Sequence, residues 1–247
     1  RRPTWSLRAD RDLYKRIHAV IAARNKGKQP ISIAHCSGTH MMPVLSPFTI
    51  FLTGEHLFSG YFPDNKELLP PEADRLYYYS YALPMDRVKS EFFHRQWGAV
   101  IAYLPCLKNQ RDIMERVEPT RDLLSRMLHA DVIFWPLWCN KQEIYKQEAI
   151  RAEFGIGDSG VEFVPYWENR LQTGDGDSAV SLYRKQDRAL VIVSNLERKA
   201  RTVRVRCTLP GVRSVRNAET GAPVELRDGV LSLEIPRNDF AVLFINN

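Results

Sequence analysis

The chain has 247 residues, of which 44% are hydrophobic and 26% charged, which is ordinary globular usage and excludes a disordered chain. The formal net charge of +6 is modest, and basic residues alternate with acids along the chain, as at Arg8, Asp10, Arg11 and Asp12. A nucleic-acid-binding protein usually gathers its basic residues on one face, so no nucleic-acid partner is expected.

The cysteines indicate free thiols. Cys36, Cys106, Cys139 and Cys207 are far apart and form no CxxC pair, so buried thiols are expected rather than disulfides or a metal cluster. No run of about 18 apolar residues occurs, so no membrane-spanning segment is expected.

The first part of the chain alternates helices with short apolar strands. Helical spacing predicts helices over residues 10–24 and 85–96, one that opens at Pro119, and one that ends near Phe154. Apolar runs predict strands at residues 31–34, 48–52 and 99–104, and the run 131–138 is either a strand or a buried helix. In that run Trp135 and Trp138 are expected in the core. The alternation is typical of βαβ units and a parallel sheet.

The hydrophobic pattern of the sequence changes after about residue 160. Short alternating runs separated by turn signals predict strands at residues 189–194, 202–207, 212–216, 230–235 and 240–245. Strands of this length and spacing indicate a small antiparallel β-sandwich.

The predicted fold class is therefore α/β plus all-β. A complete (β/α)8 barrel needs roughly 250 residues, so residues 1–160 fit only its last strands and helices, a partial barrel. Residues 161–247 are predicted to form the β-sandwich domain. An open partial barrel exposes strand edges and apolar faces, so the chain alone is expected to associate and to be inactive.

Chemistry in a parallel barrel is expected just after the carboxyl ends of the strands. His35 follows the first predicted strand, Glu55 and His56 follow the second, and Tyr103 lies at the end of the third. A strand-end carboxyl group can act as a general acid, general base or nucleophile, so Glu55 is the candidate catalytic residue, against the alternative of a loop carboxylate in a salt bridge. Glycoside hydrolysis usually requires a second carboxylate, and none is obvious at these strand ends.

A sugar site also needs apolar rings and polar groups. Aromatic residues are frequent in the segments around the predicted cleft, and sugars stack their C–H faces on such rings. The candidate substrate-binding residues are His35, His56, Tyr61, Asp64, Trp97 and Tyr103. Each has a structural alternative, namely a satisfied histidine, a turn aspartate or packing of loop aromatics. His35, His40 and His56 match no zinc signature, so no metal and no cofactor is expected.

Several segments resemble a known family. Residues 33–38 (IAHCSG), 43–46 (PVLS) and 54–56 (GEH) are similar to the last third of the barrel of large bacterial glycoside-hydrolase-like proteins from polysaccharide-utilisation systems. Residues 163–167 (FVPYW) resemble that family's entry into its C-terminal sandwich, and residues 217–221 (NAETG) and 239–245 (DFAVLFI) resemble the all-β C-terminal domains of many barrel glycosidases.

The resemblance implies binding of a poly- or oligosaccharide and hydrolysis of a glycosidic bond, with Glu55 and His35 at the sugar site. It also implies a periplasmic or secreted protein. His56 departs from the pattern, in which an amide-bearing residue would follow the glutamate. The alternative function is a non-catalytic carbohydrate-binding or structural protein on a degenerate barrel.

Overall fold

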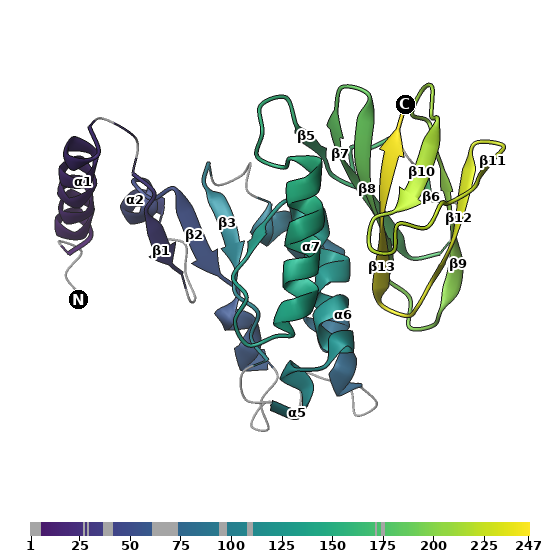
Figure 1. Cartoon of the computed structure of the whole chain (residues 1–247). Helices are drawn as coiled ribbons and strands as arrows, with labels where there is room; N and C mark the ends of the chain where they lie inside the picture. Colours follow the sequence, from purple (N-terminus) through teal and green to yellow (C-terminus); the bar gives the residue numbers. More distant parts are fainter. Residues whose placement is uncertain are drawn as a thin grey trace.

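A computed structural model describes residues 6–26, 28, 30–36, 42–60, 74–93, 98–107, 111–170, 172, 173 and 176–247. The chain up to the end of α7 contains one parallel sheet with its helices, and the rest contains two antiparallel sheets (Figure 1). Helices α6 (Val117–Met127) and α7 (Lys141–Phe154) lie between the parallel sheet and the antiparallel sheets (Figure 1).

The parallel sheet has four strands in the order of the sequence. They are β1 (Ile33–His35), β2 (Ile50–Thr53), β3 (Val100–Tyr103) and β4 (Ile133–Phe134), paired parallel β1-β2-β3-β4. Parallel neighbours require crossover connections, and here the connections contain helices, of which α6 between β3 and β4 is the longest. Sequential order is the winding of a (β/α) barrel, in which each strand pairs with the next.

The remaining helices are short, apart from the first. They are α1 (Ser6–Arg24), α2 (Met42–Leu45), α3 (Tyr79–Ala82), α4 (Met85–Arg87) and α5 (Arg111–Met114), with 3₁₀ turns at Glu55–Gly60, Arg75–Tyr77 and Leu128–Ala130 and a π-helical turn at Val88–Phe92. Helix α7 begins at Asn140, whose side chain accepts hydrogen bonds from the Gln142 and Glu143 amides, and it ends at Gly155 in the left-handed region.

The two antiparallel sheets share a core. One has the order β10-β13-β8-β7-β5 and the other β11-β12-β9-β6. Their strands are β5 (Glu162–Val164), β6 (Gln172–Thr173), β7 (Ser178–Lys185), β8 (Arg188–Asn195), β9 (Arg201–Arg206), β10 (Ser214–Asn217), β11 (Leu226–Arg227), β12 (Val230–Ile235) and β13 (Asp239–Asn246). Val191 and Leu243 of the first sheet pack in one hydrophobic cluster with Val205 and Leu231 of the second.

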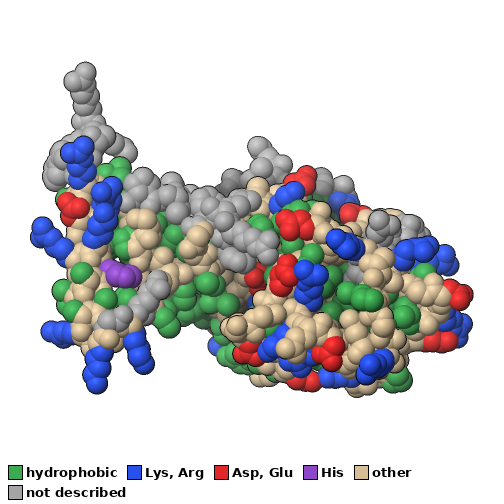
Figure 2. Space-filling model, turned by 90° about the horizontal axis from the view of Figure 1, so that it is seen from above, with side chains coloured by type: hydrophobic (Ala, Val, Ile, Leu, Met, Phe, Trp, Pro, Cys, Tyr) green, Lys and Arg blue, Asp and Glu red, His purple; other side chains and the backbone are tan. Residues whose placement is uncertain are grey.

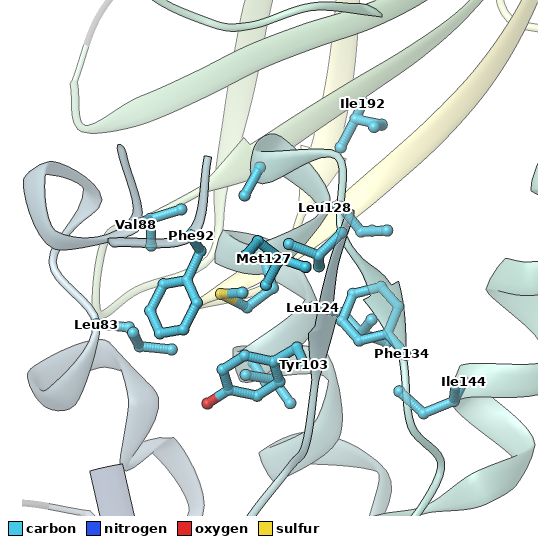
Figure 3. Close-up of a cluster of buried hydrophobic side chains, with 14 of the residues drawn as sticks. Leu83, Val88, Phe92, Tyr103, Leu124, Met127, Leu128, Phe134, Ile144 and Ile192 are labelled. Atoms are coloured by element: carbon cyan, nitrogen blue, oxygen red, sulfur yellow. The ribbon is translucent and has the colours of Figure 1, made fainter. Parts of the chain in front are cut away.

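A second hydrophobic cluster joins the helices to the first antiparallel sheet. Leu124 and Met127 of α6 belong to the same cluster as Tyr103 and Phe134 of the parallel sheet. Figure 3 shows these side chains together, with Ile192 of β8 next to Leu128. The β10-β13-β8-β7-β5 sheet is therefore covered on both faces, by helices on one side and by the other sheet on the opposite side.

The parallel sheet differs because its second face is only partly covered. Ala34, Phe51 and Ile101 are paired across the strands and buried on the helix side. Ile33 and Val100 point the other way and are 42% and 41% exposed. Side chains alternate across a strand, so Ile33 and Val100 expose apolar groups at the amino ends of β1 and β3, whereas Ala102, farther along the same face of β3, is buried.

Most predicted elements are observed with shifted ends, and some details differ. The run 131–138 forms the two-residue strand β4, and Trp135 is 42% exposed, so the expectation that it lies in the core is wrong. Trp135 follows β4 at the outer edge of the sheet, where no described strand covers it.

The free thiols are confirmed, although Cys207 is half-buried while the other three are buried. The long antiparallel strand β7 is absent from the predicted strands because Ser178 and Ser181 interrupt its apolar pattern.

No helix in the described segments is both long enough and apolar enough to cross a membrane.

Candidate functional site

The candidate site lies at the carboxyl ends of β1 and β2. His35 is the last residue of β1, and Glu55 follows β2 after Gly54. Because β1 and β2 are parallel neighbours, with His35 opposite Leu52, their ends meet at the same edge of the sheet. The structure brings the two predicted residues together: His35 Nε2 lies 3.0 Å from Glu55 Oε2.

Gly54 sets the direction of Glu55. Its φ of +122° is accessible to glycine and strained for other residues. A Cβ at this position would lie 2.5 Å from the carbonyl oxygen of Leu104, so the chain after β2 passes directly against the chain after β3. The Leu57 amide donates to the Gly54 carbonyl and closes the following turn.

The His35–Glu55 pair is accessible. The side chain of His35 is 51% exposed and that of Glu55 is 19% exposed. Glu55 can accept hydrogen bonds or a proton, and the imidazole beside it can donate one. The pair can therefore bind the hydroxyl groups of a ligand, or hold a proton close to it.

His56 belongs to a second pair, on the neighbouring turn. Its Nε2 contacts Glu91 Oε1, and its ring stacks on Phe92 with centroids 6.2 Å apart. Arg87 Nε donates to Glu91 Oε2 at 2.8 Å. Glu91 lies in the π-helical turn, and such turns occur frequently at functional sites.

Glu91 is ionised in this setting. Burial would raise the pKa of the Glu91 carboxyl, but hydrogen bonds from His56 and Arg87 outweigh it and hold the pKa below its ordinary value. Glu91 and Arg87 were missed by sequence reasoning. Their i, i+4 spacing signals the ion pair between them, whereas the contact with His56 depends on the fold.

The third strand end faces the core. Tyr103 is fully buried, its ring lies 5.3 Å from the Phe92 ring in an edge-to-face contact, and burial raises the pKa of its hydroxyl. Figure 3 shows it among the buried side chains. The ring therefore offers no exposed surface to a ligand in this chain, in contrast to the expectation of a substrate contact.

The remaining predicted residues are limited by what the structure describes. Tyr61, Asp64, Trp97 and His40 lie outside the described residues. Within the described part of the chain, no group of three or more histidine, cysteine or acidic side chains is arranged to hold a metal ion.

Cysteine chemistry does not fit the site. Cys36 directly follows His35, but its thiol is buried and directed at the Ala34 carbonyl, 3.5 Å away. Burial raises the pKa of the thiol, which disfavours the thiolate that a nucleophile requires.

Comparisons with known proteins identify the fold. The sequence matches no family model and no curated protein. Solved structures nevertheless match over nearly the whole chain. The α-amylase of Geobacillus thermoleovorans in complex with acarbose matches with a TM-score of 0.57 and 11% identity, covering 96% of this chain and 57% of that chain.

Two further structures give the same result. The α-amylase of Lactobacillus plantarum matches with a TM-score of 0.55 and 13% identity, covering 94% of this chain and 58% of that chain. The trehalose-6-phosphate hydrolase of Bacillus licheniformis matches with a TM-score of 0.54 and 11% identity, covering 94% of this chain and 60% of that chain. This chain thus spans somewhat more than half the length of the proteins it resembles, and its fold is that of a glycoside-hydrolase-like protein.

Proposed function

We propose that this chain is the C-terminal part of a glycoside hydrolase that acts on a poly- or oligosaccharide. In this proposal residues 1–160 are the last strand–helix units of a (β/α)8 barrel, and residues 161–247 are its β-sandwich. The sugar site is at the carboxyl ends of β1 and β2, where active sites of such barrels occur.

The observation that carries the proposal is the His35–Glu55 contact at the open end of the sheet. A solvent-accessible carboxylate beside an imidazole at a barrel strand end suits an acid/base or a substrate-orienting role. The sequential order of the four parallel strands and the similarity to amylase structures support the barrel. The partner carboxylate of a two-carboxylate mechanism would come from strands that precede this chain.

A non-catalytic carbohydrate-binding protein is the second candidate, and it takes its support from the lack of a proton-donating acid at Glu91, the carboxylate on the neighbouring turn. Glu91 is held ionised by Arg87 and His56, so it is a poor proton donor. In a degenerate barrel Glu55 would then only bind sugar hydroxyls or hold His35 in place.

The test uses the chain extended upstream through its own reading frame. Hydrolysis of maltooligosaccharides and a panel of other oligosaccharides is measured as release of reducing ends, and binding of acarbose is measured by calorimetry. Glu55→Gln is expected to lower hydrolysis by at least 100-fold while ligand affinity changes only a few-fold.

The matched control is Glu162→Gln, which removes an exposed carboxylate of β5 that pairs with Arg184 of β7. It is expected to change neither hydrolysis nor ligand affinity. Binding without hydrolysis in the parent protein would favour the second candidate. If neither binding nor hydrolysis is found for any oligosaccharide, both candidates are wrong.

A further inference from the structure

Trp135 is exposed at the carboxyl end of β4. Its side chain is 42% exposed, and in the described part of the chain Tyr145 on α7 is the other aromatic residue of comparable exposure. The preceding residue, Phe134, is buried among the side chains under the helices (Figure 3). Because side chains alternate across a strand, Trp135 points to the face of the parallel sheet away from α6 and α7. An indole offers a large apolar ring with one polar N–H group, a combination that is enriched at binding surfaces.

Trp135 lies on the same face of the sheet as His35. Its amide donates to the Tyr103 carbonyl at 2.8 Å, which continues the ladder between β3 and β4. The strand pairing places in one row across the sheet His35, Leu52, Ala102 and Ile133. Trp135 stands two residues beyond Ile133. Since residues i and i+2 of a strand share a face, His35 and Trp135 project from the same side of the sheet.

The two ends of this face differ in chemistry. At the amino ends of the strands Ile33, Val100 and Ile133 are exposed, and Figure 2 shows hydrophobic side chains between the end helix and the body of the molecule. At the carboxyl ends the accessible groups are the His35–Glu55 pair and the indole. Sugar sites combine aromatic rings with a few polar groups, which is the combination found at the carboxyl ends.

Glu55 and Trp135 are too far apart for one sugar ring to reach both. Glu55 follows β2, Trp135 follows β4, and β3 lies between these two strands. Neighbouring strands are about 4.8 Å apart, so the ends of β2 and β4 are roughly 10 Å apart. A ring held at Glu55 and a ring stacked on Trp135 are therefore different units of one saccharide.

The backbone holds the segment with Trp135 in a fixed conformation. Pro136 follows, and the residue before a proline is restricted to extended conformations. The Leu137 amide donates to the Trp135 carbonyl at 2.7 Å, and the Leu107 amide donates to the Trp138 carbonyl at 3.2 Å. Trp138 has a φ of +55°, which is uncommon for a bulky residue, and strained residues of this kind cluster at active sites and ligand-binding sites. A ring on a fixed backbone loses little conformational freedom when a ligand binds.

We infer that Trp135 is the stacking platform of a second sugar subsite, on which one ring of a saccharide lies while another ring is held at His35 and Glu55. The inference rests on the proposed function for the ring at Glu55. It adds that the ligand is an oligosaccharide that extends across the ends of β3 and β4. A ligand with a single ring reaches one of the two subsites only.

The test uses the chain extended upstream through its own reading frame, with Glu55→Gln so that bound sugars are not cleaved. Calorimetry compares the affinities for maltose and maltohexaose, cellobiose and cellohexaose, and xylobiose and xylohexaose. In Trp135→Ala the advantage of the hexasaccharide over the disaccharide is expected to fall at least about 10-fold, because the longer ligand loses its second contact. The hexasaccharide is also expected to protect an exposed indole from quenching by acrylamide, and this protection should disappear in Trp135→Phe.

Two variants serve as controls. Trp135→Phe keeps an aromatic ring and should retain the hexasaccharide advantage within about threefold. Tyr145→Ala removes a ring of similar exposure from α7, on the other side of the sheet, and should change the advantage less than about twofold. Urea unfolding of each variant shows whether it is folded.

The outcomes separate this inference from the proposed function. A hexasaccharide advantage that is unchanged in Trp135→Ala overturns the inference, whether or not the parent protein hydrolyses sugars. If the same variant is also destabilised, the indole packs against upstream residues instead. Binding of hexasaccharides through Trp135 without hydrolysis in the parent protein contradicts the proposed hydrolysis and supports the inference. If none of the six saccharides binds, the inference is wrong.

Discussion

The two ends of the molecule differ in how much of their apolar surface is buried. The β10-β13-β8-β7-β5 sheet is covered on both faces, and all but one of the residues of β8 and all but two of those of β13 are buried. The parallel sheet has one buried face and one face that is exposed at the amino ends of its strands, and α1 is exposed along its apolar stripe of Leu13, Ile17 and Val20. Burial of apolar surface drives folding, so most of the stability of this chain is expected at the joint between the helices and the antiparallel sheet.

The joint is also where the buried charges are paired. Arg121 of α6 donates hydrogen bonds to Asp239 at 2.7 Å, Glu219 at 2.9 Å and Glu143 at 3.0 Å, and stacks on Phe240. Burial alone would lower the pKa of Arg121, but its carboxylate partners hold it above its ordinary value. One guanidinium thus links α6, α7, the turn after β10 and the start of β13.

The largest effect is expected from removing this guanidinium. Arg121→Met leaves Glu219 and Asp239 partly buried without their main partner, which should destabilise the chain by about 3–5 kcal/mol. Urea unfolding measures the change. Arg116→Met, which breaks the exposed Arg116–Glu118 pair, is the control and is expected to cost less than about 0.5 kcal/mol. Equal losses in the two variants would contradict the view that the joint dominates stability.

The next effect tests the parallel sheet where the ends of β2 and β3 approach each other closely. Gly54→Ala forces a Cβ to within 2.5 Å of the Leu104 carbonyl oxygen at a φ of +122°, and should cost roughly 3 kcal/mol. Gly98→Ala is the matched control, because φ is also positive there but nothing lies within 4 Å. It should cost about 1 kcal/mol. If both substitutions cost the same, the close approach of the β2 and β3 ends is absent in solution.

How far the sequence could predict this molecule depends on the range of each interaction. His35 and Glu55 could be paired from sequence because parallel strand ends necessarily meet at one edge. Gly155 could be identified as the end of α7 because helix ends are local. The partners of Arg121 could not, since Glu219 and Asp239 are about a hundred residues away and nothing in their neighbourhood marks them. The burial of Tyr103 could not be predicted either, because a strand-end position does not decide which face its side chain occupies.

The third effect is a pH dependence centred on His129, which is fully buried between α6 and the antiparallel sheet. Its ring nitrogens contact the hydroxyls of Ser181 at 2.7 Å and Ser194 at 2.8 Å. Burial, aided by the charge of Arg126, lowers the pKa of His129 to about 3. An unfolded histidine titrates near 6.5. Below pH 6.5 the unfolded chain therefore binds a proton that the folded chain does not. The burial of neutral His129 contributes fully to stability above pH 6.5, and this contribution is lost as the pH falls towards 3.

At pH 5 the loss should reach about 2 kcal/mol. Asp122 acts in the opposite direction, because burial raises its pKa to about 7 even though Arg126 lowers it in part. The contribution of His129 is therefore measured as a difference. The stability advantage of the parent chain over His129→Gln should shrink by about 2 kcal/mol between pH 7.5 and pH 5. If the free energies of unfolding of the two proteins changed equally with pH, His129 would not be held neutral in the folded chain.

The smallest effect is expected at the opposite end, on α1. Ile17 is 45% exposed, so Ile17→Ala removes little burial and improves helix propensity, and the free energy of unfolding should change by less than about 0.5 kcal/mol. Urea unfolding followed by circular dichroism measures it. A cost above 1 kcal/mol would mean that the stripe is already covered in the chain alone. In the chain extended upstream, the same substitution should cost more than about 1 kcal/mol, because a covered isoleucine loses both its burial and its packing. The effect of Ile17→Ala in these two polypeptides therefore measures whether the exposure of α1 persists or is removed by the upstream strand–helix units that the proposed function requires.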